Sequence, residues 1–200
     1  MPRLTHATLD NPVVDGYRAR VCAGLTGDVL EIGFGSGLNL SHLPAAVTSV
    51  TAVEPSDVAW RLAESAVADG PVPVTRGDRE AESLSLPDVS VDAVLVTFSL
   101  CTVAGPGRAL AEVVRVLRPG GMLHFLEHGL APDEGVRRWQ RRLEPLQRRA
   151  VAGCHLTRSV PHLVQAAGLR LDAVESWYLP GPAVSHPWGY LSLGRAERLP

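Results

Sequence analysis

The stretch Val29-Leu30-Glu31-Ile32-Gly33-Phe34-Gly35-Ser36-Gly37 decides the fold of this chain. An apolar run with one acid in it leads into three glycines at alternate positions, and residues 38–40 can begin a helix. This order predicts a buried strand, a tight turn and a helix start. Glycines let the backbone approach a ligand closely, and the free amides of a helix start favour carboxylates or phosphates. The stretch therefore indicates a nucleotide-type ligand.

Short apolar runs alternate with helical patterns around this turn. Strands are predicted over 29–32, 47–53, 72–75, 91–98, 122–126, 171–177 and 188–195. Helices are predicted over 13–25, 38–43, 55–68, 107–117, 136–151 and 159–167, with a break near Pro145 and a stop at 119–121. Alternation up to residue 126 predicts an α/β, Rossmann-like, mostly parallel sheet. The last two strands have no helix between them, so we expect seven strands with an antiparallel C-terminal strand.

The composition fits one domain over residues 1–200, with a lead-in helix in 1–28 and the segment 129–158 left open as a lid or acceptor-pocket insertion. The 200 residues are 46% apolar and 20% charged, and the net charge of −2 argues against nucleic-acid binding. No run approaches the roughly 18 apolar residues that span a bilayer, so no stable membrane insertion is expected. Three cysteines without a CxxC pair predict neither a metal site nor a disulfide framework and fit a cytoplasmic setting. A homodimer is left open.

Polar residues follow five of the predicted strands. They are Glu31, Glu54, the loop 78–82, the run 99–101 and the pair 127–128. In open α/β sheets, ligands bind beyond the carboxyl ends of the strands. We therefore expect these residues to meet at one edge of the sheet and to form the ligand site.

The glycine spacing distinguishes two cofactor classes. The dinucleotide fingerprint G-x-G-x-x-G requires glycine at position 38, where this chain has leucine. The alternate glycines after Glu31 instead form the E-x-G-x-G-x-G pattern of enzymes that use S-adenosylmethionine (SAM). A carboxylate at Glu31 suits the cationic ammonium of that cofactor, and Glu54 suits its ribose hydroxyls. The alternatives are a solvated strand-end charge for Glu31 and a helix N-terminal acid for Glu54.

These residues resemble the class I SAM-dependent methyltransferases of the type-11 group. Residues 29–37 resemble the glycine motif of that family, Glu54 its second acidic position, 80–92 its D-A-E…LPF-x-D-x-S-F-D segment, and 115–121 its turn before strand five. The resemblance implies a SAM site made of Glu31, Gly33, Gly35, Gly37, Asn39, Glu54, Pro55, Glu80, Ala81, Thr97 and Ser99. In it Glu80 and Ala81 border the adenine, with Asp78 as the acceptor in an alternative register. The family often has histidine where this chain has Cys101.

A narrower resemblance concerns three later segments. Residues 97–103, 126–128 and 153–158 are similar to segments of the animal thiol methyltransferases. Members of that group carry an N-terminal membrane anchor, which we do not expect in this chain. The resemblance implies a small, fairly apolar methyl acceptor.

The acceptor side has several candidate residues. A general base is needed only if the acceptor is protonated, as a thiol or phenol is, and the candidates are His128 and His155. Each has a plainer interpretation, in a strand-end cap or a loop, and His124 inside the fifth strand is expected to be packed and satisfied. Cys101, Tyr178 and Trp188 are the candidate acceptor-binding residues, although inert thiol burial and aromatic packing are the plainer interpretations. Arsenite held by the three cysteines is a remote alternative.

The sequence thus predicts a SAM-dependent methyltransferase that acts on a small-molecule thiol, hydroxyl or amine. Methyl transfer would proceed by in-line displacement, in which the enzyme aligns the acceptor and excludes water. Two alternatives stay open. One is a catalytically silent protein that binds SAM or another nucleoside, and the other, disfavoured by Leu38, is an NAD-dependent oxidoreductase.

Overall fold

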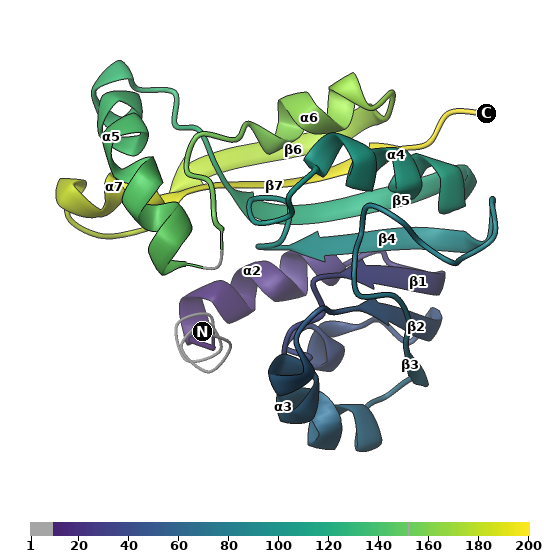
Figure 1. Ribbon diagram of the computed structural model, residues 1–200. Helices are drawn as coiled ribbons and strands as arrows, with labels where there is room; N and C mark the ends of the chain where they lie inside the picture. Colours follow the sequence, from purple (N-terminus) through teal and green to yellow (C-terminus); the bar gives the residue numbers. More distant parts are fainter. Residues whose placement is uncertain (1–9, 152) are drawn as a thin grey trace.

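The computed structural model describes residues 10–151 and 153–200. One sheet has the strand order β3-β2-β1-β4-β5-β7-β6 (Figure 1). The strands are β1 Gly27–Ile32, β2 Val47–Val53, β3 Val74–Arg76, β4 Val91–Thr97, β5 Leu117–His128, β6 Arg170–Tyr178 and β7 Tyr190–Glu197. Strands β1 to β5 pair in parallel, and β7 is antiparallel to both β5 and β6. The predicted sheet is confirmed, and its antiparallel strand lies between β5 and β6.

Helices cover both faces of the sheet. They are α2 Pro12–Cys22, α3 Asp57–Ala68, α4 Pro106–Val116, α5 Glu134–Ala150, α6 Val160–Ala166 and α7 His186–Gly189, with the 3₁₀ turns η1 Leu40–His42 and η2 Ala183–Ser185. Figure 1 shows α4 and α6 over one face, α2 and α3 over the other, and α5 and α7 beyond the strand ends. None of the described helices is long and apolar enough to cross a lipid bilayer.

Strand alternation gives the sheet two apolar cores, because successive side chains point to opposite faces. Leu30 and Ile32 pack toward α4, which buries Leu110 and Val113 from its apolar stripe. Val29 packs in the second core, toward α2 and α3. Odd-numbered residues of β1 therefore face α2, and Glu31 lies on that side of the sheet.

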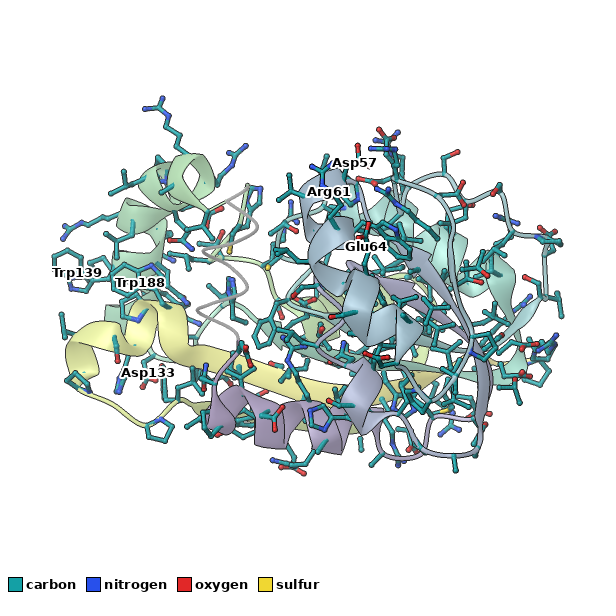
Figure 2. The ribbon with its side chains drawn as sticks, turned by 90° about the horizontal axis from the view of Figure 1, so that it is seen from below. Asp57, Arg61, Glu64, Asp133, Trp139 and Trp188 are labelled. Atoms are coloured by element: carbon teal, nitrogen blue, oxygen red, sulfur yellow. The ribbon has the colours of Figure 1, made fainter. Side chains whose placement is uncertain are left out.

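Two exposed tryptophans lie at one end of the molecule. Figure 2 shows Trp139 and Trp188 together at that end, well away from Asp57 and Glu64 on α3. The side chains of both tryptophans are exposed, by 55% and 43% respectively.

Four predictions of local structure were wrong. The helix predicted over 38–43 is only the 3₁₀ turn η1, because Gly37 is in the left-handed region (φ +77°) and Leu43, which precedes Pro44, is extended. The stop at 119–121 lies within β5, whose pairing with β4 shifts register there. Helix α5 continues through Pro145, although a proline inside a helix removes one backbone hydrogen bond and crowds the carbonyl four residues earlier.

The fourth error concerns the last strand, which begins at Tyr190 rather than at residue 188. Trp188 lies in α7, where Pro187 in the first turn favours a helix start. Residues 1–9 of the predicted lead-in lie outside the described residues.

Candidate active site

The glycine turn leaves β1 and packs against the end of β4. The amides of Gly33 and Phe34 donate to the carbonyl oxygen of Val53, at 2.9 and 3.2 Å. Gly33 has a φ of +76°, and a Cβ built there would lie 1.7 Å from the hydroxyl of Ser99. Only glycine fits this position, and the turn and the β4 end therefore form one continuous wall.

Glu54, at the end of β2, ties the turn to helix α3. It is 6% exposed. One carboxylate oxygen accepts from the amide of Gly35 at 2.8 Å, and the other accepts from the amide of Ser56 at 2.7 Å. Ser56 caps α3 by accepting from the amide of Ala59. Each carboxylate oxygen has a second lone pair, which leaves acceptor capacity for a ligand hydroxyl.

Glu31 lies in a buried polar cluster on the α2 side of the sheet. One of its oxygens accepts from the Asn39 amide nitrogen at 2.7 Å, and that nitrogen lies 3.0 Å from the Thr97 hydroxyl oxygen. The Arg18 guanidinium donates to the side-chain oxygens of Asn39 and Thr97, at 2.7 and 3.3 Å. Burial raises the pKa of Glu31 to about 7, against the opposing effects of Asn39 and Arg18.

Two buried atoms of this cluster have no hydrogen-bond partner among the described residues. They are Oε2 of Glu31, an acceptor, and Nε of Arg18, a donor. A buried polar group without a partner is costly, so such a pair points to a ligand with complementary groups. An ammonium fits the glutamate oxygen and a carboxylate fits the arginine nitrogen. The cluster thus fits the amino-acid part of SAM.

A second buried acid, Glu127, organises the loop after β4. It is fully buried, and its carboxylate accepts from the amides of Ser99, Leu100 and Cys101 at 2.6, 2.8 and 3.4 Å. Burial raises the pKa of Glu127 to about 6, although the amides of Ser99 and Leu100 act in the opposite direction. Phe98 adopts a φ of +52°, a strained conformation that is held where the chain turns into this loop.

Two cysteines and a histidine meet beside this loop. Nε2 of His128 lies 2.7 Å from Sγ of Cys154. The hydrogen bond with Cys101, together with His128, lowers the pKa of the Cys154 thiol, whereas that same bond and burial raise the pKa of Cys101. Burial opposes the charged form of His128, but the hydrogen bond to Cys154 and the charges of Cys154, Glu127 and Glu144 together outweigh burial and raise the pKa of His128.

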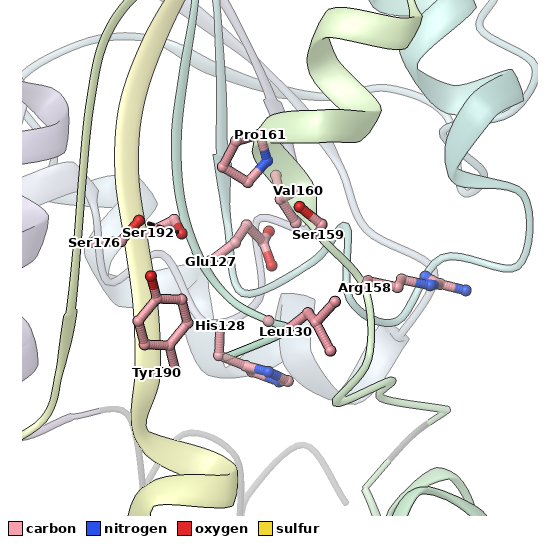
Figure 3. Close-up of a pocket in the computed structure, with 11 residues that line it drawn as sticks. Glu127, His128, Leu130, Arg158, Ser159, Val160, Pro161, Ser176, Tyr190 and Ser192 are labelled. Atoms are coloured by element: carbon pink, nitrogen blue, oxygen red, sulfur yellow. Dashed lines mark hydrogen bonds between the residues drawn. The ribbon is translucent and has the colours of Figure 1, made fainter. Parts of the chain in front are cut away.

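A small cavity of about 100 Å³ opens beside the end of β5 (Figure 3). Its wall includes Glu127 and His128, whose side chains leave β5 in different directions, and Val160 and Pro161 from the start of α6. Tyr190 closes it from β7. The cavity places a sheltered space next to the histidine.

The remaining residues predicted for the SAM site lie in the segments after β2 and β3, outside the cluster around Glu31. Glu80 is exposed and Ala81 is buried at 3% exposure. Pro55 is exposed, and its carbonyl oxygen accepts from Arg79. The carboxylate of Asp78 accepts from both the amide and the hydroxyl of Ser85. The structure therefore leaves both adenine registers open.

Three acceptor-side candidates contact α5 or the residue that precedes it. His155 lies 2.7 Å from a carboxylate oxygen of Glu144 in α5. The Tyr178 hydroxyl donates to Asp133, at the start of α5, at 2.5 Å. The Trp188 indole donates to Gln147 at 3.1 Å. These contacts place the three residues around α5, and the backbone amide of His155 also donates to the carbonyl of Cys101. The packed role expected for His124 is confirmed, because it is buried and bonded to the carbonyl of Val21.

Sequence reasoning missed one residue of this region and gave two others no role of their own. Arg18 had no signal beyond one cation in a predicted helix. Glu127 was expected at the ligand edge as part of the pair 127–128, but its bonds to the loop after β4 appear only with the fold. Cys154 lies in a segment that resembles thiol methyltransferases, but its contact with His128 appears only with the fold.

Comparisons with known proteins agree with this geometry. A methyltransferase domain model matches residues 30–125. Thiol S-methyltransferase TMT1B of Rattus norvegicus is 33% identical over 177 residues, covering 85% of this chain and 70% of that protein. Thiol S-methyltransferase TMT1A of Homo sapiens is 32% identical over 175 residues, covering 81% and 69%.

A solved SAM-dependent methyltransferase from Mesorhizobium loti shares the fold, with a TM-score of 0.68 at 19% identity and coverage of 95% of this chain and all of that one. The sheet order, the glycine turn and these matches show that the chain belongs to the class I SAM-dependent methyltransferases.

Proposed function

We propose that this methyltransferase transfers the methyl group of SAM to the thiol of a small molecule. The observation that carries the choice of acceptor is the 33% identity to a thiol S-methyltransferase over 85% of the chain. The fold adds independent support, because the three segments that resemble thiol methyltransferases lie together. The amide of His155 donates to the carbonyl of Cys101, and His128 contacts Cys154.

On the donor side, we assign the two partnerless buried atoms to the amino-acid part of SAM. Oε2 of Glu31 would accept from the ammonium, and Nε of Arg18 would donate to the carboxylate. Glu54 would accept from the ribose hydroxyls through its remaining lone pairs. Ala81 and either Glu80 or Asp78 would border the adenine. Gly33, Gly35 and Gly37 let the backbone approach the ligand.

On the acceptor side, we place the sulfur at the ends of β4 and β5. SAM supplies a methyl group on a sulfonium, and the displacement requires an aligned acceptor and little water. A thiol must also lose its proton, and His128 supplies the imidazole among the residues that border the small cavity. Tyr178 and Trp188 would bound the acceptor space from the α5 side, and His155 would steady the loop before α6 through Glu144. The three free, buried thiols support a reducing compartment such as the cytoplasm.

Three acceptors of equal shape test the proposal: benzyl mercaptan, benzyl alcohol and benzylamine, each with SAM and the purified protein. Release of S-adenosylhomocysteine and the methylated product are measured. We expect methylation of the thiol to exceed that of the other two by a factor of the order of 100 or more. Methylation of the alcohol or amine without the thiol would overturn the proposed acceptor. SAM binding by calorimetry without turnover on any acceptor would favour the catalytically silent alternative.

A further inference from the structure

Cys101, His128 and Cys154 form a cluster of metal-ligand type that no step of cofactor binding uses. Their ligand atoms, two Sγ and one imidazole nitrogen, lie within 4.8 Å of one another. Both cysteines are buried at 2% exposure. The three residues come from the loop after β4, the last residue of β5 and the loop between α5 and α6. Three separate parts of the fold thus converge on one point.

The backbone around this cluster is held in place by several hydrogen bonds. Glu127 fixes the β4 loop through three amides that end with that of Cys101. The amide of His155 donates to the carbonyl of Cys101 and so joins the two cysteine loops. Arg158 adds two bonds to the β4 loop, to the carbonyls of Leu100 and Val103. The ligand atoms therefore sit on a fixed frame, as a metal site requires.

The ligand chemistry selects the ion. Thiolates and imidazole suit a borderline or soft cation, whereas magnesium and calcium prefer oxygen ligands. A set of three protein ligands is typical of catalytic zinc sites, which keep the fourth tetrahedral position for water or substrate. A structural zinc site would instead supply four protein ligands, and the cluster found among the described residues has three.

We propose that Cys101, His128 and Cys154 bind one zinc ion, and that its fourth position takes the sulfur of the acceptor. This inference rests on the proposed thiol acceptor and departs from the expectation, drawn from cysteine spacing, that the chain has no metal site. Ser99 forms the wall against Gly33. Cys101 is two residues farther along the chain, so its Cα lies at most about 7 Å from the Cα of Ser99. The cluster is therefore a neighbour of the SAM cradle.

The zinc would take the place of a general base. Binding of the acceptor R–SH releases its proton to solvent and leaves a zinc-bound thiolate, because a coordinated thiol is deprotonated. A lone pair of that sulfur forms the new carbon–sulfur bond as the methyl carbon breaks its bond to the sulfonium. The electron pair of the broken bond stays on the donor sulfur, which becomes neutral. The product thioether carries no charge and leaves the ion, and a second thiol replaces it.

Metal binding can be measured without turnover. The full chain is stripped with a chelator under a thiol-free reductant, equilibrated with Zn²⁺ and desalted, and its zinc is counted by atomic emission. We expect about one ion per chain, and below about 0.2 in Cys101→Ser and Cys154→Ser. Co²⁺ in place of zinc should give a sulfur-to-cobalt charge-transfer band that both variants lose. Cys22→Ala, which removes the third thiol at the end of α2, should keep both signals.

Each result decides the inference. A wild type that holds less than about 0.2 zinc, or serine variants that hold as much zinc as Cys22→Ala, would overturn it. Circular dichroism of each variant shows that a lost signal does not come from unfolding, and His128→Gln supplies a third ligand variant if a serine variant is unfolded. Thiol methylation by a zinc-free protein would refute the zinc role and leave the proposed acceptor intact. A zinc-loaded protein that methylates no thiol would refute the acceptor and leave the metal site.

Discussion

The cofactor side and the acceptor side of the sheet edge are built in different ways. On the cofactor side, Glu31 and the glycines follow one another in the chain, and Glu54 ends the next strand in both sequence and space. On the acceptor side, Cys101, His128 and Cys154 meet only through the fold. The first arrangement is local in the sequence, whereas the second is assembled from residues that lie far apart in the sequence. The comparison predicts that SAM affinity and acceptor chemistry respond to different substitutions.

The largest effect is expected from Gly33→Ala on the cofactor side. The added Cβ would collide with Ser99 in a backbone conformation that alanine rarely adopts, so the cradle must distort. We expect SAM affinity to fall by a factor of the order of 100 or more, since contacts to several groups are lost together. Isothermal titration with SAM measures the effect. Gly107→Ala in α4 is the control, because its new Cβ meets nothing within 4 Å. Equal affinities of the two variants would contradict the cradle.

The next effect is expected from Glu54→Gln. The new side chain has one oxygen and one nitrogen, so the backbone amide of either Gly35 or Ser56 faces the nitrogen and loses its acceptor. The ribose also loses its charged acceptor. The loss of about 1.5–3 kcal/mol corresponds to a roughly 10- to 100-fold weaker binding of SAM. Glu64→Gln, on the exposed side of α3, serves as the matched control. An unchanged SAM affinity in the Glu54 variant would remove the ribose assignment.

On the acceptor side, Glu127→Gln should separate the two functions. The substitution leaves at least one of three backbone amides without its acceptor and loosens the loop that carries Cys101. We expect about a tenfold lower kcat/KM for the thiol and a smaller fall in SAM affinity, because Glu127 also holds the amide of Ser99 in the wall against Gly33. Steady-state methylation and calorimetry measure the two quantities. A fall in SAM affinity as large as the fall in kcat/KM would show that the two sides are not separable.

A smaller, graded effect is expected from pH. The pKa of Glu31 stands near 7 because the group is buried, and Arg18 and Glu54 are its charged neighbours. Only the carboxylate pairs with the ammonium of SAM. As the pH falls from 7 to 6, the ionised fraction drops from one half to about one tenth, so SAM binding should weaken about fivefold. Glu31→Gln should bind more weakly with a flat profile over this range. The same profile in both proteins would assign the titration to another group.

Much of the cofactor side could be predicted from the sequence, because its determinants are local. Glycine spacing, the acid in β1 and the acid at the end of β2 are all visible without a fold. Where local rules failed, a second constraint intervened. The apolar run after Gly37 looked helical, but Pro44 favours an extended Leu43, and the run forms only a 3₁₀ turn. Pro145 looked like a break, but the helix continues on both sides.

The acceptor side was less accessible to sequence reasoning. Wide spacing made the cysteines look unrelated, because no local rule brings residues 101 and 154 together. Their proximity arises from the path of the chain after β5, which runs out along α5 and returns before α6. Arg18 belongs to the cofactor cluster only because α2 packs against the sheet. A single arginine in a predicted helix does not indicate this position.

One measurement tests the division between the two sides most directly: single-turnover methyl transfer to benzyl mercaptan by His128→Gln at saturating SAM. The variant removes the imidazole from the acceptor cluster and touches none of the groups around Glu31. We predict a rate lower by a factor of about 100, with the SAM dissociation constant within about twofold of wild type. A wild-type rate, or a loss of SAM affinity equal to that of Glu54→Gln, would contradict the account.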